Sequence, residues 1–284
     1  MKINNICPDY PEYLKIIQTI ANAPKRLWYI GSIPHRRLPT VAIIGTRRPT
    51  AYGQMVAHKL AYQLAKQGVV IVSGLALGVD AIAHRAALEA GGTTIAIMPG
   101  GLTHISPRSN YNLAVDIIKN GGMLLSDYAP EDPIYKQNFI ARNRIVSGIS
   151  DGLLVIEATA KSGTMHTASF ALEQGRAVMA VPGNITSAAS EGCNNLIKRG
   201  ALAVTDVNDI FAEIGLATAR QTSLPLGNSP QEQSLLQLLF AGESDGDVLQ
   251  QKSKLPSAAF SQTLTMLELS GKIRALGANQ WSLK

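Results

Sequence analysis

Short apolar runs, rich in β-branched residues, alternate along the chain with segments of helical periodicity. The runs are apolar at consecutive positions, which is typical of strands that are buried on both faces. The predicted strands cover residues 41–44, 69–73, 93–98, 123–125, 152–156, 177–181 and 201–204. Because helical segments separate these strands, we predict a doubly wound α/β domain over residues 41–215, with a mostly parallel sheet covered on both faces.

The turns that follow the predicted strands are rich in glycines and hydroxyl groups. They read Gly45-Thr46-Arg47, Ser73-Gly74, Pro99-Gly100-Gly101, Ser126-Asp127, Ser162-Gly163-Thr164 and Pro182-Gly183. The carboxyl ends of parallel strands meet at one edge of a sheet, and ligands bind in the crevice there. We therefore predict that this edge carries a rim of exposed backbone N–H groups, which suits an anionic ligand.

Residues 41–53 carry the clearest sign of such a site. A buried strand, a tight polar turn and a helix follow one another, and Arg47 and Arg48 add positive charge at the turn. The sequence has neither the dinucleotide-binding glycine pattern nor the P-loop, so no nucleotide cofactor is expected. On this segment alone, an ordinary strand-to-helix turn with two solvated arginines is the alternative interpretation.

A second segment, residues 135–150, combines basic residues with an aromatic ring. If it is helical, Phe139 and Asn143 share one stripe, Arg142 lies one turn from Phe139, and Lys136 adds charge nearby. A single-stranded nucleic acid needs cations for its phosphates and flat faces for its bases, so this segment predicts a groove for an unpaired strand. The alternative is that the ring belongs to the core and the arginines are solvated.

Residues 1–40 contain five prolines around one short helical pattern at residues 13–21. This lead-in is predicted to pack on the main domain. Arg36 and Arg37, just before the first predicted strand, are interpreted as part of a solvated linker.

Residues 216–230 have the composition of a linker, and residues 231–284 form a pattern of their own. Predicted helices at 232–240, 246–251 and 256–270, the last with Ser257 as N-cap, precede a hairpin at 272–276 and 280–283. This order predicts a winged-helix domain. The basic residues Lys252, Lys254, Lys272, Arg274 and Lys284 are balanced by Glu232, Glu243, Asp245, Asp247 and Glu268. Since the longest of these helices has no Lys or Arg, we expect the domain to contact protein rather than duplex DNA.

The charge of the whole chain adds to this picture. Its 284 residues include 26 Lys and Arg against 20 Asp and Glu, a net charge of +6 that favours an anionic partner. Because the C-terminal segment is neutral, the excess belongs to residues 1–228. Cys7 and Cys193 share no metal-binding spacing, so no metal site is expected, and two cysteines suit a reducing compartment. No long apolar run opens the sequence, so we expect no signal peptide, no membrane span and a cytoplasmic location.

With these motifs in hand, the chain resembles the DNA processing protein A (DprA/Smf) family of bacterial transformation and recombination proteins. The matching motifs are Val-Ala-Ile-Ile-Gly-Thr-Arg from position 41, Ser-Gly-Leu-Ala-Leu-Gly-Val-Asp from 73, Pro-Gly-Gly-Leu from 99, Phe139 with Arg-Asn-Arg from 142, Glu-Ala from 157, Ser-Gly-Thr from 162 and Val-Pro-Gly-Asn from 181. The resemblance implies an extended Rossmann-like domain that binds and protects single-stranded DNA. It also implies that the protein helps to load the RecA recombinase and forms a homodimer, with no catalytic activity of its own.

The motifs and the resemblance together give one set of candidate DNA-binding residues. These are Gly45, Thr46, Arg47, Arg48, Ser73, Gly74, Gly100, Gly101, Lys136, Phe139, Arg142, Asn143, Lys161, Ser162, Gly163 and Thr164. Backbone amides and Arg47 are expected to hold phosphates, while Phe139 stacks on a base.

Two other functions are weighed against this one. A nucleoside monophosphate phosphoribohydrolase of the related lysine-decarboxylase-like group would continue Pro-Gly-Gly with Gly-Thr and a nearby Glu, whereas this chain has Leu102-Thr103-His104. Glu157 and Asp80 remain candidate acids for that reaction, but orienting a loop or capping a helix explains each as easily. A transcriptional regulator that acts through the C-terminal domain is disfavoured by that domain's zero net charge.

Overall fold

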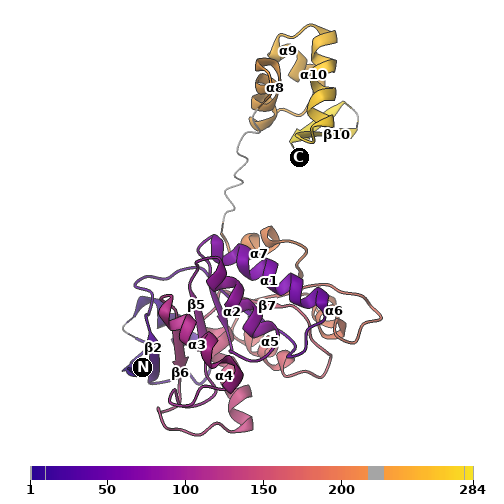
Figure 1. The fold of residues 1–284 in the computed structure, drawn as a ribbon. Helices are drawn as coiled ribbons and strands as arrows, with labels where there is room; N and C mark the ends of the chain where they lie inside the picture. The colour runs from indigo at the N-terminus through magenta and orange to yellow at the C-terminus, as the bar shows by residue number, and fades with distance from the viewer. Residues whose placement is uncertain (1, 10, 217–226, 278, 284) are drawn as a thin grey trace. The chain divides into compact units, whose positions relative to one another are not determined.

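The computed structural model describes residues 2–9, 11–216, 227–277 and 279–283. The chain divides into two compact units, Met1–Ala217 and Thr218–Lys284 (Figure 1). Most of the predicted linker, residues 217–226, lies outside the described residues, so each unit is considered by itself.

The first unit is built on one sheet whose strands follow the order β1-β2-β6-β5-β4-β3-β7-β8-β9 among the described residues. The parallel strands are β3 (Thr40–Ile44), β4 (Val70–Ser73), β5 (Thr94–Ile97), β6 (Met123–Ser126), β7 (Gly152–Val155), β8 (Ala177–Ala180) and β9 (Leu202–Ala203). All seven predicted strands are confirmed. The strand order reverses at β3, which has β4 on one side and β7 on the other, so a ligand-binding switch point lies between the carboxyl ends of β3 and β7.

The lead-in adds two strands that the pattern did not predict. β1 (Asn4–Ile6) pairs antiparallel with β2 (Leu27–Gly31), and β2 pairs antiparallel with β6. Between them, η1 (Glu12–Thr19) is a 3-10 helix at the position of the predicted helical pattern. The sheet is therefore mostly parallel with an antiparallel margin, which is common in large α/β sheets.

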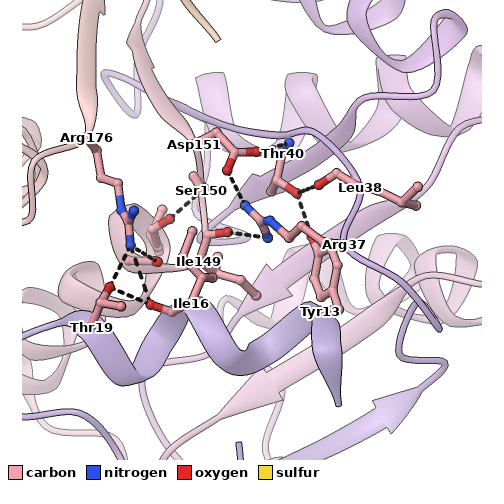
Figure 2. Close-up of polar contacts among 12 residues, drawn as sticks. Tyr13, Ile16, Thr19, Arg37, Leu38, Thr40, Ile149, Ser150, Asp151 and Arg176 are labelled. Atoms are coloured by element: carbon pink, nitrogen blue, oxygen red, sulfur yellow. Dashed lines mark hydrogen bonds and ion pairs between the residues drawn. The ribbon is translucent and has the colours of Figure 1, made fainter. Parts of the chain in front are cut away.

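Arg37 joins this lead-in to the amino edge of the sheet, where the parallel strands begin (Figure 2). Its guanidinium donates to Ile149 O at 3.0 Å and to Asp151 Oδ1 at 2.5 Å, and it lies 5.2 Å from the centroid of the Tyr13 ring. Asp151 Oδ2 also accepts the backbone N–H of Thr40 at 2.8 Å. The interpretation of Arg37 as part of a solvated linker is therefore wrong, because its donors are used inside the fold.

Helices cover both faces of the sheet (Figure 1). One face carries α1 (Ala51–Lys66), α2 (Val79–Glu89), α3 (Tyr111–Lys119) and α7 (Val207–Glu213); the short η2 (Arg108–Asn110) precedes α3. The other face carries η1, α4 (Lys136–Gly148), α5 (Thr164–Glu173) and α6 (Glu191–Lys198). The helical interpretation of residues 136–148 is confirmed, whereas α6 and α7 were not predicted. No helix among the described residues is long and apolar enough to cross a lipid bilayer.

The second unit has the predicted order of three helices and a hairpin. Its elements are α8 (Pro230–Phe240), α9 (Gly246–Ser253), α10 (Ser257–Leu269), β10 (Ile273–Gly277) and β11 (Gln280–Leu283). Leu235, Leu264 and Leu267 are among the buried residues of its own apolar core. The prediction of Ser257 as N-cap is wrong, because Pro256 takes that position and Ser257 Oγ accepts a hydrogen bond from Gln250.

Candidate nucleic-acid interface

The carboxyl edge of the sheet brings together the two segments that the sequence singled out. Arg47 follows β3 at the switch point, and Phe139 lies in the first half of α4. The Arg47 Cζ atom lies 5.6 Å from the centroid of the Phe139 ring, which is a cation–π contact. Arg47 is exposed, and within the described part of the chain its guanidinium makes no hydrogen bond or ion pair. Its donors are therefore available to a ligand.

The loop that carries Arg47 is clamped by its neighbours. Thr46 N–H donates to Glu157 O at 2.8 Å, across the switch point, and Val79 N–H donates to Thr46 O at 3.2 Å. A β-carbon at Gly45 would lie 2.7 Å from Val79 Cγ2, so only glycine allows this approach. Gly78, at φ +77°, packs directly against the Thr46 carbonyl. The backbone is fixed on both sides, and the Arg47 side chain projects from it.

Glu157 holds the beginning of α1. Its buried carboxylate accepts the Thr50 N–H at 2.9 Å and the Thr50 hydroxyl at 2.6 Å. Thr50 Oγ1 in turn accepts the N–H of Gly53, which makes Thr50 the N-cap of α1. A β-carbon at Gly53 would collide with the Glu157 carboxylate. Both carboxylate oxygens are thus occupied in orienting the turn after β3.

Asp80 has a similar role in the turn after β4. Its Oδ2 atom accepts the Gly74 N–H at 3.0 Å and the Ala76 N–H at 3.4 Å. Burial raises the pKa of Asp80, and the nearby Arg142 guanidinium opposes that shift. Like Glu157, this carboxylate serves the loop backbone.

Arg142 is not exposed at this edge. The residue is 4% exposed, and its side chain donates to Gly74 O at 2.8 Å and to Ile97 O, at the ends of β4 and β5. Burial lowers the pKa of Arg142 to about 10, so the side chain is still a cation at neutral pH. The prediction that Arg142 contacts DNA directly is wrong, because helix α4 turns this residue toward the sheet.

Four further candidates are buried. Ser73 Oγ donates to Ile43 O at 2.6 Å, the Gly74 N–H donates to Asp80, and the Gly101 N–H donates to Asp132 O at 3.0 Å. The fourth, Gly100, is buried as well. A β-carbon at Gly101 would collide with Pro130 O. The prediction of an exposed amide rim is wrong at these positions, because the glycines allow other parts of the protein, rather than a ligand, to approach closely: the Arg142 side chain at Gly74, the Ile134 side chain at Gly100 and backbone carbonyls at Gly101.

The family model described as DNA recombination-mediator protein A matches residues 4–215. The chain belongs to this family. A second model, the DprA winged helix domain, matches residues 205–279, in agreement with the helices and hairpin of the second unit.

Individual members of the recombination-mediator family are clearly similar to this chain. DNA processing protein DprA of Bacillus subtilis is 45% identical over 207 residues, which cover 72% of this chain and 68% of that protein. Protein Smf of Escherichia coli is 38% identical over 262 residues, covering 89% of this chain and 70% of that protein. The match to Protein Smf of Synechocystis covers 57% of the length of that relative.

Two solved structures of the family share the fold. DNA processing protein A from Streptococcus pneumoniae matches with a TM-score of 0.68 and 38% identity, covering 75% of each chain. DNA processing protein A from Helicobacter pylori, whose structure concerns its single-stranded DNA binding mode, matches with a TM-score of 0.66 and 34% identity. That match covers 75% of this chain and 95% of the other.

The remaining candidates give the recombination-mediator fold a basic carboxyl edge. Arg48, Lys136, Lys161 and Gly163 are exposed, while Gly45, Thr46, Asn143, Ser162 and Thr164 are half-buried. Lys136 is the first residue of α4, and the first turns of α1, α4 and α5 contain no Asp or Glu. Because helix N-termini carry partial positive charge, this arrangement favours an anion.

Exposed apolar residues at this edge were missed from the sequence. Tyr52 is 43% exposed and its hydroxyl donates to Pro182 O at 3.0 Å, while Ile185, in the turn after β8, is 92% exposed. Tyr52 is the second residue of α1, directly after the predicted turn, and this position was the available signal. These residues add apolar surface beside the cations.

Proposed function

We propose that this chain binds single-stranded DNA at the carboxyl edge of its sheet, protects the strand and promotes the loading of RecA, as a homodimer without catalytic activity. The observation that carries the DNA-binding part is the exposed Arg47 over the Phe139 ring at the switch point. Membership of the family and the H. pylori relative support the choice of an unpaired strand. The RecA and dimer parts rest on the family resemblance.

The chemistry of this edge suits an unpaired polynucleotide. Arg47, Arg48, Lys136 and Lys161 are exposed cations that can meet successive phosphates. Phe139 offers an apolar face to a base, and base stacking on an aromatic ring contributes about 1–3 kcal/mol. In the free protein the Arg47 guanidinium covers this ring, so a phosphate that draws the guanidinium away also opens the ring to a base.

The two buried carboxylates favour binding over glycosidic cleavage. Glu157 accepts hydrogen bonds from Thr50, and Asp80 accepts them from the turn after β4. A general acid has to reach the leaving group of its substrate. Release of a free base from a nucleotide by the purified protein would nevertheless revive the phosphoribohydrolase alternative.

The DNA-binding proposal is tested by fluorescence anisotropy with a labelled oligothymidine and a duplex of equal length across a range of salt concentrations. Arg47→Ala should weaken oligothymidine binding by about 10- to 150-fold, since hydrogen bonds to charged groups contribute ~1.5–3 kcal/mol. It should also reduce the slope of log K against log salt by about 0.7. Arg199→Ala is the matched control, because Arg199 is an exposed arginine after α6, at the opposite edge of the sheet.

Two results would contradict the proposal. One is an Arg47→Ala protein that binds oligothymidine as tightly as the Arg199→Ala control. The other is equal affinity of the native protein for the duplex and the single strand. The RecA and dimer parts are measured separately, as the rate of RecA filament assembly on DNA with and without this protein and as the sedimentation mass of the chain.

A further inference from the structure

We propose that the buried Arg142 is a positioning residue that fixes the placement of Arg47 relative to Phe139. The proposal rests on the DNA-binding function proposed above and extends it to a residue that DNA does not touch. It is carried by a continuous set of contacts that joins Arg142 to both members of the pair.

The first step is the set of hydrogen bonds that the Arg142 guanidinium makes at the carboxyl edge of the sheet. One guanidinium nitrogen donates to the carbonyls of Gly74 and Ile97, and Nε donates to Asn143 Oδ1 at 3.2 Å. Gly74 follows β4 and Ile97 ends β5, whereas Arg142 and Asn143 belong to α4. A single side chain therefore ties helix α4 to the ends of two strands.

The second step is that the fold makes room for this cation. A β-carbon at Gly74 would collide with the Arg142 guanidinium, so the glycine leaves free the space that this guanidinium occupies. Asp80 supplies opposite charge nearby. Burying an ion pair is expensive, and well-packed apolar residues of similar volume often serve stability equally well. Stability by itself therefore does not account for a buried arginine here, whereas a geometric role does.

The third step leads from Gly74 to Arg47. The turn after β4 is held by side chains: Asp80 accepts the Gly74 N–H, and Asn110 Nδ2 donates to Leu75 O at 2.9 Å. This support keeps Leu75 at φ +56°, a conformation that a leucine rarely adopts. A movement of Gly74 is therefore passed along the turn rather than absorbed in it.

The same turn ends against the Arg47 loop. Gly78 packs on the carbonyls of Thr46 and Arg47, and Val79 N–H donates to Thr46 O. On the other side, Phe139 lies one turn before Arg142 on α4. Arg142 thus supports the Arg47 guanidinium through the turn after β4, and it supports the Phe139 ring through helix α4, to which both residues belong.

The test is a double-mutant cycle measured by oligothymidine anisotropy on the full chain. Arg142→Lys keeps the charge and loses the forked geometry, and Gly74→Ala pushes on the same guanidinium from the loop. Each should weaken binding about fivefold in the native background and less than about twofold in an Arg47→Ala background, because residues that act through one another are not additive. Arg37→Lys, the same substitution at the amino edge, should leave affinity unchanged.

The possible results of this cycle distinguish a failure of the positioning role of Arg142 from a failure of the proposed DNA-binding function. Equal losses in both backgrounds, or no loss from a folded Arg142→Lys or Gly74→Ala protein, would overturn the positioning role. If Arg47→Ala itself has no effect on binding, the proposed function fails instead. Should neither variant fold, NMR of the native chain decides: the amide resonances of Gly74 and Gly78 should shift when oligothymidine binds, and unchanged resonances would reject the proposal.

Discussion

Strand β3 has an arginine stacked on an aromatic ring at each of its ends, and the two pairs differ in what else they contact. At the amino edge, Arg37 lies 5.2 Å from the Tyr13 ring and bonds to Ile149 O and Asp151 (Figure 2). At the carboxyl edge, Arg47 lies 5.6 Å from the Phe139 ring and its guanidinium is exposed.

The difference shows that the stacking of an arginine on an aromatic ring does not by itself decide whether the arginine holds the fold together or is available to a ligand. Around Arg37, the chain supplies the Ile149 carbonyl and the Asp151 carboxylate, so the guanidinium has a hydrogen-bond acceptor and an opposite charge inside the fold. Around Arg47, the neighbouring carboxylate of Glu157 is occupied by Thr50. One arginine therefore joins the lead-in to the sheet, and the other is left with free donors beside a half-buried ring.

The largest effect that separates the two ends is expected from Arg37→Ala. The substitution leaves Asp151 without its cation and Ile149 O without its donor, so the free energy of unfolding should fall by about 2–4 kcal/mol. Urea denaturation measures this loss, and the affinity for oligothymidine should not change under native conditions. A stable Arg37→Ala protein, or one that folds normally but binds DNA poorly, would remove the contrast between the edges.

A smaller effect is expected from Phe139→Leu at the other end. Leucine keeps an apolar side chain in contact with the helix but removes the flat face, so oligothymidine affinity should fall by about 1–2 kcal/mol, roughly 5- to 30-fold. The free energy of unfolding should change by less than about 1.5 kcal/mol. Anisotropy and urea denaturation on the same preparation separate the two quantities. An unchanged affinity would mean that no base stacks on this ring.

The smallest effect is expected at Lys136, the first residue of α4. Its positive charge lies next to the partial positive charge of the helix N-terminus and is slightly unfavourable for the helix. Lys136→Ala should raise the free energy of unfolding by a few tenths of a kcal/mol, about 0.3, and reduce the salt slope of DNA binding by about 0.7. Lys119→Ala is the mirrored control, since Lys119 ends α3 at the amino edge and complements the dipole there. The control should be slightly destabilised with unaltered binding. An unchanged salt slope for Lys136→Ala would place that lysine outside the DNA path.

Much of the secondary structure could be predicted from the sequence, because apolar periodicity is a local property. All seven parallel strands and the helix over residues 136–148 are where the pattern placed them. The antiparallel strands β1 and β2 were not predicted, since their pairing partners are distant in sequence and prolines surround them. The winged-helix order was likewise evident from helix lengths and turn residues, apart from the N-cap of α10.

The candidate site was predicted less evenly. Arg47 and Phe139 were chosen from separate motifs, and the structure places them in contact. Arg142, Ser73, Gly74, Gly100 and Gly101 were chosen for the same edge and are buried in it. Glycines that permit close approach look alike in a sequence whether protein backbone or a ligand comes near.

The sequence by itself determined the alternation of strands and helices, the basic character of the first unit and the residues that gather at the carboxyl edge. Only the tertiary structure decided which of those residues face outward. The reason is that the exposure of an arginine depends on the carbonyls and carboxylates that distant segments bring to it. Arg37 bonds to the carbonyl at the C-cap of α4 and to the Asp151 carboxylate, and Arg142 bonds to the carbonyls at the ends of β4 and β5. Among the described residues, the contact of the Arg47 guanidinium is with the ring of Phe139.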